Sequence, residues 1–418
     1  MSVDSDIRRL GQSARSAARL LAGLSSQQKR DMLLRMAEVV EQQQSQIQAE
    51  NEEDLAAGRQ AGLSSALLDR LELTDSRFSA MVAGIRNVAE LPDPVGEEIE
   101  AMTHPAGMRI SRRRVPIGVI GIIYESRPNV TADAAALCLR SGNAVILRGG
   151  REAIRANTAI ANALRAGGAA AHLPDGAVQL IQTTDRAAVR ALCQLDEYVD
   201  LIIPRGGEGL IRAVVDMSRV PVIKHNKGVC HTYVDVSADL EMACGICENA
   251  KCHRPGVCNA METLLVHEQV VGDFLPNMCQ RLTDLGVELR GDERARAVVP
   301  TMRAATTTDW DEEYLDLILS VGVVDDVDAA IAHITKYGSQ HSDAIVAADE
   351  VAQEKFLSGV DSAAVYVNAS TRFTDGAEFG MGAEIGISTD KLHARGPMGL
   401  RELTTYKFVV QGSGQIRA

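Results

Sequence analysis

The spacing of hydrophobic residues divides this 418-residue chain into a helical start and a longer part in which strands and helices alternate. Within residues 5–60 and 75–89, apolar residues recur every three to four positions, which predicts amphipathic helices. Residues 99–102 and 108–115 then alternate between apolar and polar types. This second pattern predicts a β-hairpin.

Most of the chain beyond residue 115 alternates short apolar runs with segments of helical periodicity. The runs that predict strands are residues 115–123, 144–147, 178–181, 199–204, 221–223, 263–266, 287–290, 344–346, 364–367 and 406–411. Strands that alternate with helices predict a parallel, doubly wound α/β sheet. Ligands of such sheets bind beyond the carboxyl ends of the strands, so we expect binding residues in those loops.

Composition narrows the class of protein. The chain is 46% hydrophobic and has a net charge of −13, which argues against nucleic acid as its main partner. No run approaches the ~18 apolar residues of a membrane span, and the first residues lack the features of a signal peptide. We therefore expect a cytoplasmic protein without membrane contact, whose eight cysteines are reduced.

Two glycine-containing turns follow predicted strands and carry arginines. Arg205, Gly206 and Gly207 precede a predicted helix, and the segment 148–151 reads Arg-Gly-Gly-Arg. Glycines let a phosphate approach the backbone N–H groups at the start of a helix. Neither turn matches the Rossmann fingerprint or a P-loop, and either one alone is equally well explained as a tight turn. Their occurrence at two strand ends favours a dinucleotide site.

Residues 249–263 concentrate candidate chemistry between a predicted helix and a predicted strand. A zinc site could be drawn from Cys244, Cys247, Cys252, His253 and Cys258. However, the first two of these cysteines fall on the predicted helix beside apolar residues, whereas structural zinc ligands usually come from polar, glycine-rich knuckles. We therefore expect no metal site and interpret the helical cysteines as small buried residues.

Cys258 differs from the other cysteines because it follows a Pro-Gly turn. The nearby cations Lys251, His253 and Arg254 would lower the pKa of its thiol and raise the fraction of thiolate. Cys258 is therefore the candidate nucleophile, with Cys252 as a second thiol that could react.

The segment 249–266 resembles the nucleophile segment of the γ-glutamyl phosphate reductases (glutamate-5-semialdehyde dehydrogenases), which belong to the aldehyde dehydrogenase superfamily. Further matching stretches occur, in order, at residues 114–131, 203–211, 337–346 and 396–407. An ordered series through nearly the whole chain is more specific than any single motif.

The resemblance implies an aldehyde dehydrogenase-like α/β fold with three parts. A doubly wound cofactor-binding domain would comprise residues 1–96 and 115–230. A catalytic domain with Cys258 would span residues 231–402, and its C-terminal part could return to the cofactor domain. A small β element for oligomerisation would combine residues 97–114 and 403–418.

The resemblance also implies the reaction and the partners. The reaction is NADPH-dependent reduction of L-glutamate 5-phosphate to L-glutamate 5-semialdehyde in proline biosynthesis, through a thioester on Cys258. The chain would form a homo-oligomer, either a dimer or a tetramer, and would contact glutamate 5-kinase transiently.

Particular residues acquire expected roles from the same resemblance. The side chain of Asn129 would stabilise the oxyanion. Cofactor binding is expected of Arg148, Gly149, Arg151, Arg205, Gly206 and Gly207. Substrate binding is expected of Glu125, Arg127, Lys224, His225 and Arg254.

Two departures from the superfamily pattern refine the prediction. The general-base glutamate of hydrolytic members would fall at or near Lys224, where this chain has no carboxylate, so its thioester should not be hydrolysed. Arg151 stands where NAD-preferring members have a ribose-binding glutamate, and an arginine suits the 2′-phosphate of NADPH.

Two alternatives remain open. An aldehyde dehydrogenase that transfers its acyl group to coenzyme A also lacks the base. A non-catalytic assembly partner could keep the fold, although the intact Cys258 argues against it.

Overall fold

The computed structural model describes residues 2–224 and 227–417, which form two compact units. The first unit contains the chain up to Lys224 together with residues 380–386 and the chain from Met398 onward. The second unit contains the chain from residue 227 to Phe379 together with residues 387–397. None of the described helices is long and apolar enough to cross a membrane.

The first unit begins with the helices that the apolar spacing predicts, and polar residues cap them. Ser25 precedes α2 in a capping box: its Oγ accepts from Gln28 N–H at 3.2 Å, and Gln28 Oε1 accepts from Ser25 N–H at 2.9 Å. The helices of this unit are α1 (Val3–Leu21), α2 (Ser26–Gln42), α3 (Gln44–Gln60), α4 (Ser65–Leu71), α5 (Asp75–Glu90), α6 (Asn129–Arg140), α7 (Ile154–Ala169), α8 (Arg186–Cys193) and α9 (Glu208–Met217), with the short 3₁₀ helix η1 (Arg151–Ala153).

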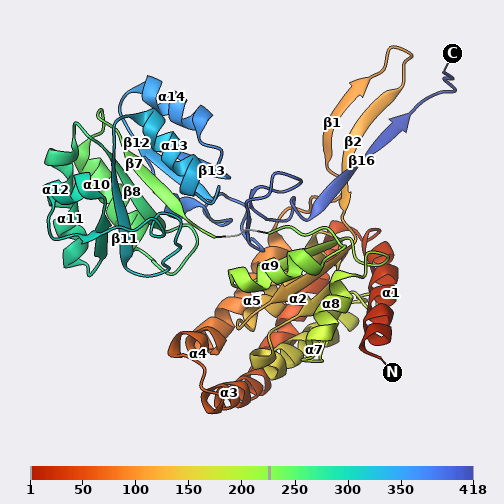
Figure 1. Ribbon diagram of the computed structural model, residues 1–418. Helices are drawn as coiled ribbons and strands as arrows, with labels where there is room; N and C mark the ends of the chain where they lie inside the picture. Colours follow the sequence, from red (N-terminus) through yellow and green to blue (C-terminus); the bar gives the residue numbers. More distant parts are fainter. Residues whose placement is uncertain (1, 225–226, 418) are drawn as a thin grey trace. The chain divides into compact units, whose positions relative to one another are not determined.

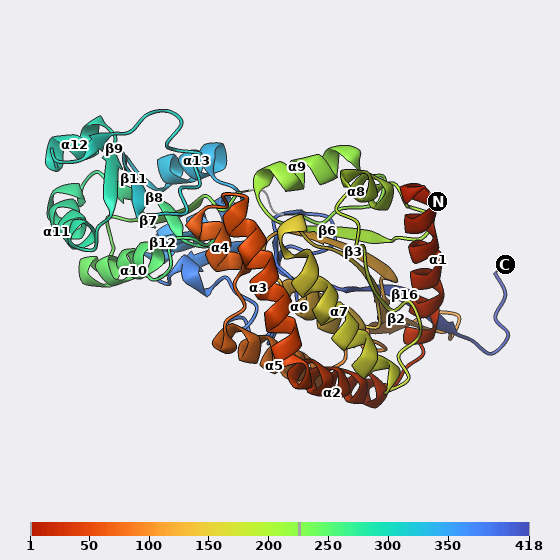
Figure 2. The same cartoon turned by 90° about the horizontal axis from the view of Figure 1, so that it is seen from below.

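A parallel sheet forms the core of the first unit, in the order β5-β4-β3-β6. Its strands are β3 (Val119–Tyr124), β4 (Ala144–Arg148), β5 (Val178–Leu180) and β6 (Leu201–Arg205). One face of the sheet packs against α1, α8 and α9, and the other packs against α6 and α7 (Figure 2). Helices α2, α3 and α5 form a further layer outside α6 and α7. The predicted doubly wound α/β architecture is therefore confirmed.

The predicted strand at residues 115–123 is instead two strands that meet at Gly118. Gly118 has a φ of +133°, and a Cβ there would lie 2.2 Å from Asp200 Oδ2. Only glycine tolerates both the backbone conformation and the close approach. The chain therefore turns out of β2 (Arg109–Pro116) before it enters the buried β3.

An antiparallel arm of three strands extends from the first unit (Figure 1). The hairpin of β1 (Glu98–Thr103) and β2 was predicted, and β16 (Thr404–Gln411) pairs with the other edge of β2 from Thr404↔Pro116 to Gln411↔Arg109. The arm exposes Met102, Tyr406, Phe408 and Val410.

The second unit contains a larger parallel sheet in the order β10-β9-β11-β8-β7-β12-β13. Its strands are β7 (Cys230–Val234), β8 (Met261–His267), β9 (Glu288–Gly291), β10 (Arg303–Ala304), β11 (Ile318–Val324), β12 (Ser342–Val346) and β13 (Ala364–Val367). Its helices are α10 (Leu240–Cys252), α11 (Val271–Asp284), α12 (Glu293–Val298), α13 (Val327–Tyr337), α14 (Glu350–Gly359) and η2 (Thr371–Phe373), and a short pair is formed by β14 (Ile387–Ser388) and β15 (Gly396–Pro397).

The central strands of the second sheet are buried on both faces. In β8, Leu264 and Val266 pack in one hydrophobic cluster with α10 and α11, while Leu265 packs in another with α13 and α14. In β7, Val234 belongs to the first of these clusters and Tyr233 to the second. Successive side chains of a strand point to opposite faces, so a continuous apolar run marks a strand covered on both sides.

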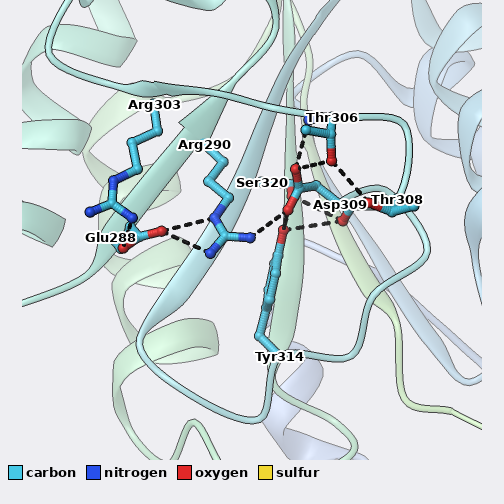
Figure 3. A network of polar contacts seen from close by, with 8 residues as sticks. All are labelled: Glu288, Arg290, Arg303, Thr306, Thr308, Asp309, Tyr314 and Ser320. Atoms are coloured by element: carbon cyan, nitrogen blue, oxygen red, sulfur yellow. Dashed lines mark hydrogen bonds and ion pairs between the residues drawn. The ribbon is translucent and has the colours of Figure 1, made fainter.

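A polar network fixes the loop between β10 and β11 (Figure 3). Asp309 accepts from Arg290 Nη1 at 2.6 Å and from Tyr314 OH at 2.9 Å, and Tyr314 OH also lies 2.8 Å from Ser320 Oγ. At the end of this loop, Leu315 N–H donates to Glu262 Oε1 at 3.2 Å. The network thus joins the loop to β8, β9 and β11.

Two details differ from the sequence analysis. The first unit ends at Lys224, before the predicted boundary at residue 230. Val229 already belongs to the second unit, where its N–H donates to Ser339 Oγ at 2.9 Å. The strand predicted at 221–223 is wrong: only a single bridge, Ile202↔Val222, forms there.

Candidate active site

The residues expected to bind the cofactor lie at one edge of the first sheet. Arg148 ends β4 and pairs with Ile123 of β3, while Arg205 ends β6 and pairs with Tyr124 of the same strand. The parallel register therefore brings the loops after β3, β4 and β6 to the same carboxyl edge, where ligands of doubly wound sheets bind.

Glu125 contacts the glycine turn that precedes α9. Glu125 Oε2 accepts from Gly207 N–H at 2.9 Å, and Glu125 N–H donates to the Arg205 carbonyl at 3.1 Å. A Cβ on Gly206 would lie 2.3 Å from Glu125 Oε2. The Gly207 N–H was expected to face a phosphate, but it donates to the Glu125 carboxylate. A helix N-terminus attracts carboxylates as well as phosphates.

The arginines at this edge make it suitable for a dinucleotide. Arg148 donates to the Gly149 carbonyl at 2.7 Å, but its buried Nε has no hydrogen-bond partner, and burial lowers the pKa of its guanidinium. In the described part of the chain, neither Arg148, Arg151 nor Arg205 forms an ion pair with a carboxylate. The carboxylates of Glu125 and Glu152 also lie at this edge, where they accept from the backbone N–H groups of Gly207 and Ser126. The arginines are thus the cationic donors available to phosphates there.

Gly149 is required by packing as much as by any ligand. A Cβ there would lie 2.2 Å from Asn157 Nδ2 and 3.1 Å from the Tyr124 ring. These side chains belong to a buried hydrogen-bond network, in which Thr131 Oγ1 lies 2.6 Å from Tyr124 OH and donates to Asn157 Oδ1 at 3.0 Å. No pattern in the sequence predicted this network.

Asn129 begins α6 and is held by a residue that the sequence analysis missed. Asn129 Nδ2 donates to Asp133 Oδ2, one helical turn later, at 2.8 Å. Burial raises the pKa of Asp133 to about 6, against the opposing effects of the Asn129 hydrogen bond and the charge of Arg205. The spacing of four residues on a helix was the available signal for this pair.

Three other residues were expected to bind the substrate, and the structure describes two of them. Arg127 lies exposed just before α6, and Lys224 is half-buried at the end of the first unit. His225 lies outside the described residues.

In the second unit, Cys258 lies at the amino edge of the sheet. It is half-buried in the turn between α10 and β8, three residues before β8 begins at Met261. The segments before the neighbouring strands β7 and β12 meet the same edge. The rule of carboxyl-edge sites, which locates the candidate residues of the first unit, therefore does not locate Cys258.

Backbone contacts hold the Cys258 turn in place. A Cβ on Gly228 would lie 2.1 Å from the Cys258 carbonyl oxygen and 2.5 Å from its Cα. Cys230 Sγ donates to the same carbonyl at 3.2 Å. The chain before β7 thus packs directly on the backbone of the candidate nucleophile.

The segment 371–374 supports the other side of this turn. Thr371 Oγ1 donates to the Asn259 carbonyl at 2.7 Å, and Asn259 Nδ2 donates to the Thr374 carbonyl at 2.9 Å. Arg372 Nη1 donates to Asn259 Oδ1. Arg372 was not predicted from the sequence, since no local pattern links it to a turn so far away in the chain.

The cations near Cys258 differ from those expected. Lys251 is completely buried and pairs with the equally buried Glu262 at 2.6 Å, so its charge is balanced inside the fold. Burial lowers the pKa of Lys251 and raises that of Glu262. Arg254 is exposed on the turn, and it interacts electrostatically with Arg372.

The remaining cysteines lie in hydrophobic surroundings. Cys244 and Cys247 belong to the apolar cluster of α10 and α11, and burial raises the pKa of both thiols. Cys252 is half-buried, and burial likewise raises the pKa of its thiol. No group of three or more His, Cys, Asp or Glu side chains suited to a metal occurs among the described residues.

The family model described as the aldehyde dehydrogenase family matches residues 2–309. The chain belongs to the aldehyde dehydrogenase family. Enzymes of this family depend on a nicotinamide dinucleotide, which agrees with the charge and turns at the carboxyl edge of the first sheet.

Full-length relatives narrow the position of the chain within the aldehyde dehydrogenase family. It is 57% identical over 417 residues to the γ-glutamyl phosphate reductase of Moorella thermoacetica, with 100% of both chains covered. The crystal structure of the γ-glutamyl phosphate reductase of Thermotoga maritima has a TM-score of 0.97 and 47% identity, covering 99% of this chain and 100% of that one.

A more distant solved structure shares only the fold. An engineered glycolyl-CoA reductase with bound NADP⁺ is 16% identical, with a TM-score of 0.66, covering 97% of this chain and 96% of that one.

The contact between Gly228 and Cys258 predicts that alanine substitutions at two nearby glycines have very different effects on activity. Gly228→Ala should lower kcat/KM about a hundredfold, because the new Cβ displaces the backbone of the nucleophile. Gly256→Ala, on the same turn, should stay within about twofold, because its Cβ would meet nothing closer than the Leu315 carbonyl at 3.6 Å. Steady-state rates of the two purified variants test this, and equal losses would contradict it.

Proposed function

We propose that this chain reduces L-glutamate 5-phosphate to L-glutamate 5-semialdehyde and phosphate with NADPH, the second step of proline biosynthesis from glutamate. The observation that carries the proposal is the full-length likeness to γ-glutamyl phosphate reductases, together with the turn that holds Cys258. The second unit would be the catalytic domain and the first the cofactor domain.

The first chemical step is covalent. The Cys258 thiolate attacks the carbonyl carbon of the acyl phosphate, so that a carbon–sulfur bond forms and the carbon–oxygen bond to phosphate breaks. The backbone N–H of Cys258 and the side chain of Asn129 are the proposed donors to the oxyanion. Asp133 keeps the Asn129 amide oriented for that role.

The cofactor would be held by the arginines and glycine turns at the carboxyl edge of the first sheet. When bound, the reduced nicotinamide supplies the hydride that converts the thioester to the aldehyde. Arg151, exposed at the start of η1, is the proposed partner of the 2′-phosphate, which favours NADPH over NADH.

The thioester should survive until it is reduced. Hydrolysis needs a base that activates water, and the position of that base in hydrolytic relatives falls at or near Lys224, which is not a carboxylate. This residue pattern also suits acyl transfer to coenzyme A, so the acceptor must be tested.

The arm would form the oligomer interface. It exposes apolar side chains, and its two edge strands, β1 and β16, pair with no further strand within the described chain. Such edges and apolar surfaces are usually covered by a partner, here a second copy of the chain. Dimer and tetramer both remain compatible with this proposal.

The nucleophile is tested by two cysteine variants. Cys258→Ala should lose essentially all activity, because no thiolate remains to form the thioester. Cys252→Ala should retain activity within a few-fold, because this thiol has a raised pKa. The assay follows NADP⁺ reduction with glutamate semialdehyde and phosphate, and coenzyme A should not replace phosphate. Full activity of the Cys258 variant, or a preference for coenzyme A, would refute the proposal.

The cofactor preference is tested at Arg151. Arg151→Glu should raise the KM for NADP⁺ at least about tenfold, since a charge-assisted hydrogen bond is lost and a like charge added. The KM for NAD⁺ should change much less. Arg19→Glu, which changes an exposed arginine in the last turn of α1, is the matched control. An unchanged NADP⁺ preference in the Arg151 variant would contradict this assignment.

A further inference from the structure

The guanidinium of Arg372 lies against the turn that carries Cys258. Asn259 follows Cys258 directly, and Arg372 Nη1 donates to its Oδ1 across a separation of 113 residues in sequence. The bonds from Thr371 Oγ1 and to the Thr374 carbonyl fix the segment on both sides of Arg372. The fold therefore holds this side chain beside the nucleophile.

Among the described residues Arg372 forms no close ion pair with a carboxylate, and Asp375 acts on it only through its charge. The residue is half-buried, and its buried Nε has no hydrogen-bond partner. Burial and, after it, the charge of Arg254 lower the pKa of Arg372, whereas Cys258 and Asp375 act in the opposite direction. The charge of this half-buried cation is only partly compensated, and an anion bound beside Arg372 and Arg254 would stabilise it further.

We propose that Arg372, together with Arg254, binds the phosphate group of the acyl phosphate while Cys258 attacks the adjacent carbonyl carbon. The inference rests on the proposed function and extends it to the leaving group. Arginine presents a planar fork of N–H donors that matches phosphate oxygens. Asn259 takes one of these donors and orients the rest of the guanidinium.

The chemistry of the substrate favours phosphate over the α-carboxylate as the bound anion. In L-glutamate 5-phosphate, a single oxygen joins the phosphorus to the carbon that the thiolate attacks. The α-carboxylate is separated from the same carbon by two methylene groups and the α-carbon. Cations beside the nucleophile are therefore placed for the phosphate, and the carboxylate must bind further away.

The two arginines would act on a balanced exchange at one carbon. In the forward direction the carbon–sulfur bond forms, the carbon–oxygen bond breaks, and the electron pair leaves with the phosphate. Arg372 and Arg254 stabilise the negative charge that accumulates on that leaving group. In the reverse direction they hold inorganic phosphate as it attacks the thioester and releases the Cys258 thiolate.

The reverse reaction separates the two anions, because phosphate is then a substrate of its own. Arg372→Met should raise the KM for inorganic phosphate at least about tenfold, with little change in the KM for glutamate semialdehyde. The KM for phosphate of Arg372→Lys should lie between those of Arg372→Met and the wild type, since lysine keeps the charge but lacks the planar fork of donors. Arg281→Met, which removes an exposed ion pair with Glu241 in the same unit, is the control and should change neither constant.

A rapid-mixing experiment without phosphate distinguishes phosphate binding from a purely structural role. Semialdehyde and NADP⁺ should give the wild type and Arg372→Met the same single-turnover burst of NADPH, because forming the thioester does not involve phosphate. A lost burst in Arg372→Met would overturn the proposal in favour of a role in positioning Asn259 and Cys258. A rise in the semialdehyde KM alone would instead assign Arg372 to the carboxylate. If the wild type itself gave no burst, the proposed function would fail.

Discussion

The close contact between the backbones of Gly228 and Cys258 is the constraint on which the candidate site depends. Any side chain at residue 228 would overlap the carbonyl and Cα of the cysteine, so the two segments meet only if one is glycine. Cys230 and Asn259 add hydrogen bonds on either side of the same turn. The backbone of the Cys258 turn is therefore held by main-chain contacts and by hydrogen bonds from short side chains, which have few rotamers.

Buried polar groups in the second unit provide the rigid background for that turn. Lys251 and Glu262 lie at the end of α10 and the start of β8, on either side of Cys258, and form an ion pair that is closed to solvent. Glu262 also accepts from Leu315 N–H, which connects the pair to the network around Asp309. An arrangement that separated Lys251 from Glu262 would leave a buried charge without compensation, so the packing that keeps them together is favoured over alternatives.

The sequence predicted the class of fold correctly, and it nominates Cys258 as the nucleophile, which stays a prediction. It did not reveal the contacts that support the Cys258 turn. The apolar runs of β3, β4 and β8 are unmistakable, whereas β7 escaped prediction because it includes His231 and Thr232. Both are completely buried, and His231 Nδ1 lies 2.9 Å from the buried Asp343. A polar residue whose partner lies on another strand cannot be recognised from local periodicity.

The candidate site shows the same limit. Turn residues near Cys258 in sequence were identified, yet Lys251 proved to belong to a buried pair, and Arg372 was missed. A cation that is close to Cys258 in sequence can point toward the thiol or into the protein interior. For Lys251 the direction of the side chain is set by its place on α10, and it points into the interior. The contact of Arg372 with Asn259 depends on tertiary folding across 113 residues.

Peptide mapping by mass spectrometry tests the central claim, a thioester on Cys258, most directly. The protein would be incubated with glutamate semialdehyde and NADP⁺ without phosphate, quenched in acid and digested. The account predicts a glutamyl adduct on the peptide that contains Cys258, released when phosphate is added before the quench. An adduct confined to Cys252, or the absence of any adduct while NADPH accumulates, would contradict it.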